Sequence, residues 1–106
     1  MAKYLWQASY TAAGAKGVLS EGGSARRNAV ENVVEGLGGK IDALYYAFGD
    51  DDVVVIVDLP SYAAATAVSL AVAATGSVRI KTTPLIDVAE VDEAAKLSVP
   101  YRAPGA

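Results

Sequence analysis

The chain has 106 residues, of which 53% are hydrophobic and 20% are charged, and its formal net charge is −3. This size and apolar content predict one folded domain without disulfides and argue against intrinsic disorder. The chain contains no cysteine and no histidine. These absences exclude thiolate metal sites, cysteine nucleophiles and Ser-His-Asp triads, and we expect neither a metal nor a cofactor.

Charge and hydropathy argue against two classes of partner. An acidic chain without a basic patch is a poor nucleic-acid binder. The first residues lack the charged region and long apolar run of a signal peptide, and the alanine-rich stretch at 63–74 is too short to span a membrane. We therefore expect a cytoplasmic protein that binds neither nucleic acid nor membrane.

The first half of the chain predicts two strands and two helices. Alternating residues with several aromatics predict a strand at 3–10. A short helix is expected at 12–19, and a second one at 24–37 with Ser24 as its N-cap and one apolar face. A second strand is expected at 40–48. Strict alternation along it places four residues on one face: Ile41, Ala43, Tyr45 and Ala47.

The second half predicts two more strands and two more helices. Five branched apolar residues in a row favour a central strand at 53–59 that is covered on both faces. A helix at 61–75 and a strand at 77–83 follow. A last short helix is expected at 87–97, and residues 98–106 form a tail.

The helix expected at 61–75 contains no charged residue. A helix that is apolar all round is buried on more than one side, which favours a subunit contact or packing against the tail. If this helix contacts another subunit, Ala67→Glu or Ala71→Glu is expected to break the contact, because a buried unpaired carboxylate is costly.

The order of elements predicts an α+β fold, the ferredoxin-like βαββαβ arrangement with an extra C-terminal helix. Residues 1–97 form the domain and 98–106 the tail. Since the predicted central strand is apolar on both faces, the face of the sheet without helices needs cover. A second copy of the sheet supplies it in a dimeric α+β barrel.

Several short stretches together carry a resemblance to a known family. They are residues 4–11 (YLWQASYT), 24–27 (SARR), 37–40 (LGGK), 48–53 (FGDDDV), 58–60 (DLP) and 78–83 (VRIKTT). In their order and spacing they resemble the GYD-domain family, a group of small bacterial proteins in the dimeric α/β-barrel set. The resemblance covers residues 3–86 and implies a barrel-like dimer.

The name-giving motif of that family, Gly-x-Tyr-Asp, is only partly present. Gly49 and Asp52 match it, but Asp51 stands where tyrosine is usual. If that tyrosine has a chemical role in the family, this chain has lost it. Relatives in the wider fold set include cofactor-free monooxygenases and small-ligand lyases, an analogy at the level of the fold alone.

Aromatic residues gather on the first two strands and suggest a pocket. The candidate ligand-binding residues are Trp6, Tyr10, Arg26 and Tyr46. Arg26 falls on the apolar stripe of its helix, where a guanidinium can clamp an anionic group. The alternatives are an ordinary aromatic core and a salt bridge from Arg26 to Asp52 or another acid.

Without histidine and cysteine, catalysis would rest on Asp58, Tyr46 or Arg26. Asp58 could act as a base if desolvation raised its pKa, and a tyrosine hydroxyl could donate a proton. The alternative for Asp58 is a cross-strand pair with Arg79 or Lys81.

Three consecutive carboxylates, residues 50–52, could contribute oxygen ligands to a divalent cation. Consecutive residues rarely converge on one ion, so a hairpin turn is the favoured interpretation.

Small-molecule binding in a pocket of a dimeric barrel is the favoured function. One alternative is a structural homo-oligomer without catalysis, and another is a cofactor-independent enzyme. If the protein is an enzyme, we expect Arg26, Asp58 and a tyrosine to converge on an open cavity. If it is an assembly protein, we expect these groups to pair with protein partners and the cavity to be filled.

Overall fold

The computed structural model describes all 106 residues, which form four strands and four helices. The elements are β1 (Ala2–Tyr10), α1 (Ala12–Glu21), α2 (Gly23–Gly36), β2 (Lys40–Tyr46), β3 (Val53–Leu59), α3 (Tyr62–Ala74), β4 (Val78–Pro84) and α4 (Val88–Ala95). Every boundary lies within two residues of its predicted position. The element order confirms the predicted α+β fold of the ferredoxin-like type with an extra C-terminal helix.

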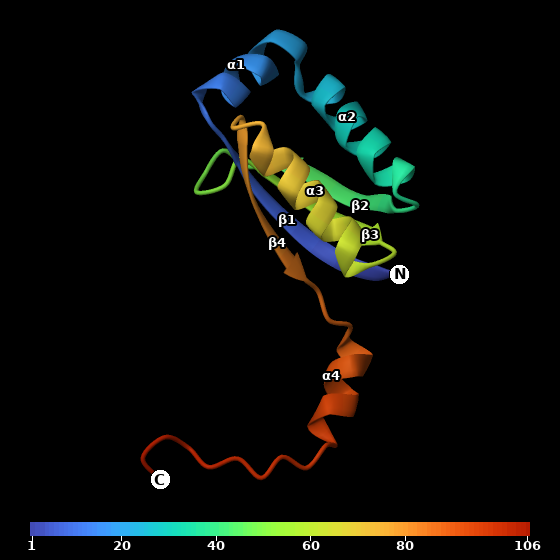
Figure 1. Ribbon diagram of the computed structural model, residues 1–106, viewed down its shortest axis with the longest axis vertical. Coiled ribbons are helices and arrows are strands. Elements are labelled where there is room, and N and C mark those ends of the chain that lie inside the picture. The colour runs from blue at the N-terminus through green and yellow to red at the C-terminus, as the bar shows by residue number, and fades with distance from the viewer.

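The four strands form one antiparallel sheet in the order β2-β3-β1-β4. As predicted, β3 is a central strand. Helices α2 and α3 lie over the same face of the sheet, with α1 at one end of the layer (Figure 1). The sheet does not close on itself, and its second face carries no helix in the single chain.

The core lies between the sheet and these helices. Its buried apolar side chains come from β1, β2, β3, α2 and α3: Tyr4, Trp6, Ala8, Val34, Leu44, Val53, Val55, Val57, Leu59, Ala65 and Val68. Every second residue of β1 and β3 is buried, because side chains alternate across a strand. On the other face Leu5, Val54 and Ile56 are half-buried.

Two local details of the helices explain where they begin. The prediction that Ser24 caps α2 is wrong, because the helix already begins at Gly23. Gly22 ends α1 and precedes α2 with φ of 84°, a left-handed conformation that favours glycine. By contrast, the Ser61 hydroxyl accepts a hydrogen bond from the Ala64 N–H at 3.1 Å and caps α3.

The expected alternation of β2 is wrong in its first half. The pairing with β3 shifts between Ile41 and Ala43, so Asp42 is an extra residue in the strand. Ile41 therefore lies on the helix-covered face together with Leu44, and it packs against the core. Alternation could not predict this, because a bulge is a property of strand pairing.

The C-terminal segment extends away from the sheet (Figure 1). Every residue from Leu85 to Ala106 is exposed, including the apolar residues of α4. The segment therefore does not cover α3, whose outer residues Ala67 and Ala71 are exposed. None of the four helices is long and apolar enough to cross a membrane.

Candidate functional site

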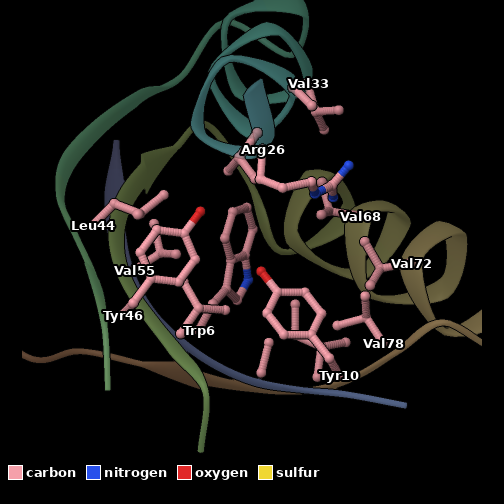
Figure 2. Close-up of a pocket in the computed structure, with 15 residues that line it drawn as sticks. Trp6, Tyr10, Arg26, Val33, Leu44, Tyr46, Val55, Val68, Val72 and Val78 are labelled. Atoms are coloured by element: carbon pink, nitrogen blue, oxygen red, sulfur yellow. The ribbon is translucent and has the colours of Figure 1, made fainter. Parts of the chain in front are cut away.

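An apolar cavity of about 250 Å³ lies between the sheet, α2 and α3 (Figure 2). Fourteen of its fifteen lining residues are hydrophobic. The floor comes from the helix-covered face of the sheet and the roof from α2 and α3. The lining residues are Trp6, Ala8, Tyr10, Arg26, Ala29, Val30, Val33, Leu44, Tyr46, Val53, Val55, Val68, Val72, Val78 and Ile80.

Trp6 lines this apolar site, and its indole nitrogen is buried. The side chain is 3% exposed, and its Nε1–H has no hydrogen-bond partner. A buried donor without a partner costs about 1–3 kcal/mol. Figure 2 shows the indole nitrogen on the side of the cavity where Tyr10 lies. An acceptor atom that reached this N–H would remove the cost.

Tyr10 and Arg26 form the polar end of the cavity. Burial and the neighbouring Tyr46 raise the pKa of the Tyr10 hydroxyl, and the Arg26 guanidinium opposes that rise. Tyr10 and Arg26 both line the cavity. The carboxylate oxygen nearest to Arg26 belongs to Glu21, 3.9 Å away. The alternative partner Asp52 instead accepts a hydrogen bond from the Tyr10 backbone N–H at 2.8 Å.

Tyr46 lines the cavity, but its hydroxyl is engaged elsewhere. It donates a hydrogen bond to the Gly23 carbonyl at 2.9 Å. Its ring also stacks on Phe48, with ring centroids 5.8 Å apart. A phenol has one proton to donate, so in this arrangement Tyr46 serves to hold the start of α2 over the sheet.

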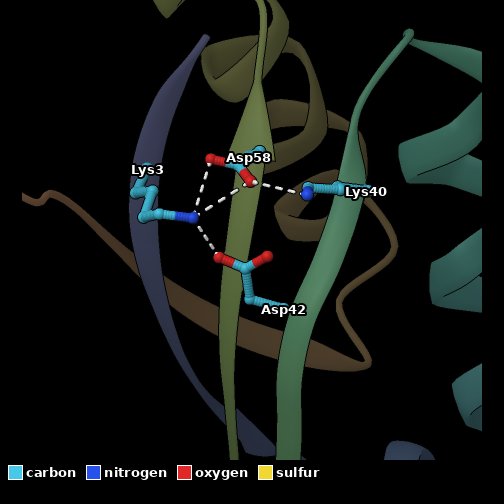
Figure 3. Close-up of polar contacts among 4 residues, drawn as sticks. All are labelled: Lys3, Lys40, Asp42 and Asp58. Atoms are coloured by element: carbon cyan, nitrogen blue, oxygen red, sulfur yellow. Dashed lines mark hydrogen bonds and ion pairs between the residues drawn. The ribbon is translucent and has the colours of Figure 1, made fainter.

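Asp58 lies on the opposite face of the sheet from the cavity (Figure 3). Its carboxylate accepts hydrogen bonds from the Lys3 ammonium at 3.0 and 3.1 Å, and Lys40 lies 3.9 Å away. Lys3 also pairs with Asp42. The expected partners Arg79 and Lys81 are on β4, which borders β1 rather than β3. Asp58 therefore does not converge with Arg26 and Tyr46.

The pairing of Lys3 and Asp42 makes stability depend on pH. Hydrogen bonding to Lys3 lowers the pKa of Asp42 below 3.8, and hydrogen bonding to Asp42 and Asp58 raises the pKa of Lys3 above 10.5. Because folding lowers its pKa, the Asp42 carboxylate stabilises the fold above pH 3.8. This stabilisation is lost as the pH falls through the pKa of Asp42 in the folded state. Because folding raises its pKa, the Lys3 ammonium stabilises the fold below pH 10.5. This stabilisation is lost as the pH rises through the pKa of Lys3 in the folded state.

We therefore expect Lys3→Met to lower Tm at neutral pH, with the difference from wild type shrinking at both pH extremes. Thermal melts across the pH range, monitored by circular dichroism, measure this. Lys16→Met is the matched control, because Lys16 is exposed and lies in no ion pair. A Tm difference for Lys3→Met that is constant across pH would contradict the assignment.

In the acidic turn before β3, the carboxylates of Asp51 and Asp52 have protein partners. Asp51 pairs with Lys81 at 3.2 Å and accepts a weaker hydrogen bond from Gln7. Asp52 binds the backbone of Tyr10, as described above. These contacts connect the turn to β1 and β4, and they agree with the interpretation of residues 50–52 as a hairpin turn.

The structure thus brings together Trp6, Tyr10, Arg26 and Tyr46 around one cavity and places Asp58 elsewhere. Sequence reasoning missed the helix residues of the lining, although Ala29, Val30 and Val33 lie on the apolar stripe that it identified. It also missed Lys3. Lys3 is two residues before Leu5, so strand alternation puts both on the open face of the sheet.

The family model described as GYD domain matches residues 4–95. No curated protein and no solved structure gave a match. Because the matched segment spans most of the chain, this protein belongs to the GYD domain family.

Proposed function

We propose that the protein binds a small molecule in the cavity between the sheet and helices α2 and α3. The observation that carries the proposal is the apolar cavity itself, whose lining includes Trp6, a residue with a buried and unpartnered indole N–H. Ligand sites are typically concave and apolar, with a few polar groups that fix orientation. Trp6, Tyr10 and Arg26 supply such groups here. We place this function in the bacterial cytoplasm.

The size of the cavity supports an organic ligand. An apolar cavity of about 150 Å³ holds benzene, and this one measures about 250 Å³. A neutral probe with an apolar chain and one hydroxyl, such as 1-octanol, is suited to fill it. Its oxygen can accept a hydrogen bond from Trp6.

We expect 1-octanol at ten times its Kd to raise the free energy of unfolding by about 1.4 kcal/mol. Such a change raises Tm by several degrees in a domain of this size. Ala29→Phe, which directs a ring into the cavity from α2, is expected to abolish the shift. Thermal melts of both proteins with and without octanol measure it.

Ala25→Phe is the matched control, since Ala25 is exposed on the same helix and does not line the cavity. It is expected to keep the octanol shift. If octanol leaves the wild-type Tm unchanged, or shifts all three proteins equally, the cavity is not the binding site and the proposal fails.

We propose self-association as a second function, on a separate observation. The open face of the sheet carries half-buried apolar side chains at its centre, Leu5, Val54 and Ile56, with no helix over them. Charged residues flank this centre, Lys3, Asp42 and Asp58 at one end and Asp51 and Lys81 at the other. A second copy laid face to face buries the apolar centre and gives a dimeric barrel.

A cofactor-independent enzyme remains the third proposal. In this arrangement its groups would be Tyr10 and Arg26 at the polar end of the cavity. Asp58 is separated from them by the sheet, and the Tyr46 hydroxyl is engaged with Gly23. The geometry therefore favours binding over proton transfer.

A further inference from the structure

We propose that the ligand of the cavity is an amphipathic anion, with an apolar body among the valines and a carboxylate-type head beside Arg26. This inference rests on the proposed binding function and names the chemical class of its ligand. It follows from the distribution of charge around the cavity.

The cavity has a single charged residue in its lining. Arg26 is that residue, and no carboxylate belongs to the lining set. Figure 2 shows the Arg26 side chain reaching from α2 over the cavity. A cationic ligand would meet a like charge there, and a ligand without a charge would leave the guanidinium unused.

Arg26 is poorly neutralised by the protein itself. Its nearest carboxylate oxygen, on Glu21, is 3.9 Å away, and that side chain is 52% exposed. Arg26 also lies in the first turn of α2, where the helix dipole disfavours a positive side chain. Its neighbour Arg27 differs, because it pairs with Glu31 at 2.9 Å on the outer face. An anion would provide Arg26 with the partner that Arg27 already has.

Two neutral donors accompany the guanidinium. Tyr10 lines the same cavity as Arg26, and the Trp6 indole N–H has no acceptor. A carboxylate has two oxygens that together accept several hydrogen bonds, and hydrogen bonds to a charged group are stronger than neutral ones. A carboxylate therefore satisfies this set of donors better than a hydroxyl does.

The test uses three probes that share one apolar body: octanoate, 1-octanol and octylammonium. Isothermal titration calorimetry at neutral pH measures the Kd of each for the full chain. We expect octanoate to bind about tenfold more tightly than octanol. We expect octylammonium to bind more weakly than octanol, because its charge faces Arg26.

Variants of the two adjacent arginines assign the effect. Arg26→Gln is expected to abolish the preference for octanoate over octanol, and Arg26→Lys is expected to retain part of it, since lysine keeps the charge but loses the planar fork. Arg27→Gln is the matched control and is expected to keep the full preference. Arg27→Gln is also expected to leave the octanol affinity unchanged, since Arg27 does not line the cavity. For the two Arg26 variants the readout is the ratio of the octanoate and octanol affinities measured on the same protein.

The outcomes separate this inference from the function on which it rests. If octanol and octanoate bind the wild type equally, the binding function stands and the anionic class is overturned. If none of the three probes binds, the binding function itself fails. If Arg26→Gln keeps the tenfold preference, the role of Arg26 is overturned. The comparison of probes on the wild type does not depend on whether a variant folds.

Discussion

Gly39→Ala is expected to lower the free energy of unfolding by about 3 kcal/mol. A Cβ at this position would lie 2.2 Å from the Asp58 carbonyl oxygen and 2.9 Å from the Leu59 Cδ2. Because the first of these atoms is backbone in the central strand, it cannot move aside without disturbing the sheet. Tm is expected to fall by roughly 12–24 °C.

Gly36→Ala is the matched control, three residues earlier at the end of α2. A Cβ there meets nothing within 4 Å. Alanine in a helix is more favourable than glycine by about 0.5–1 kcal/mol, so this variant is expected to be more stable than wild type. Urea unfolding of both variants measures the difference. If Gly39→Ala is as stable as wild type, the close approach of the α2–β2 connection to β3 is contradicted.

Ile56→Glu is expected to convert the proposed dimer into a monomer. Ile56 is half-buried at the centre of the open face, directly opposite Leu5 on β1. In a face-to-face dimer the substitution would bury two unpaired carboxylates, at about 3 kcal/mol or more for the pair. This raises the dimer Kd more than about 100-fold. Size-exclusion chromatography with light scattering measures the mass.

Ala67→Glu is the control on the other side of the molecule, on the outer face of α3. A dimer kept by Ala67→Glu and lost in Ile56→Glu assigns the contact to the sheet. The reverse result assigns it to the uncharged helix α3 and overturns the face-to-face arrangement. A wild-type protein with the mass of one chain would contradict self-association altogether.

The order of the elements was predictable because each has a strong local signal. β1 alternates without interruption, and α3 combines a capping serine with a run of alanines. The bulge in β2 was not predictable, because Asp42 fits an alternating pattern by itself and only the pairing with β3 makes it an extra residue. The predicted alternation of β2 is therefore wrong at Ile41, before this position, and holds from Ala43 to Tyr46.

The ion-pair partners of Asp58 could be identified only from the order of the strands in the sheet. From the sequence, the cationic residues of β4 were reasonable partners, because β4 follows β3 in the chain. The sheet places β1 between them, so Lys3 from β1 and Lys40 from β2 are the neighbours of Asp58 instead. A charge pair between strands could be expected from the sequence, but its partners required the topology.

The candidate site was predictable in part for a similar reason. The gathering of aromatic residues predicted Trp6 and Tyr10 as pocket residues, and helical periodicity placed Arg26 on the apolar stripe of its helix. The free state of the Trp6 N–H and the engagement of the Tyr46 hydroxyl with Gly23 depend on side-chain positions that no periodicity specifies. These two details decide which aromatic residue has a donor to offer a ligand.

The most direct test of the binding proposal follows the indole N–H of Trp6, the single tryptophan of the chain. It gives one indole signal in a proton–nitrogen correlation NMR spectrum. Titration with 1-octanol is expected to move this signal downfield in a saturable way, because the N–H gains its first acceptor. An indole signal that stays in place while octanol reaches saturating concentration would contradict the account.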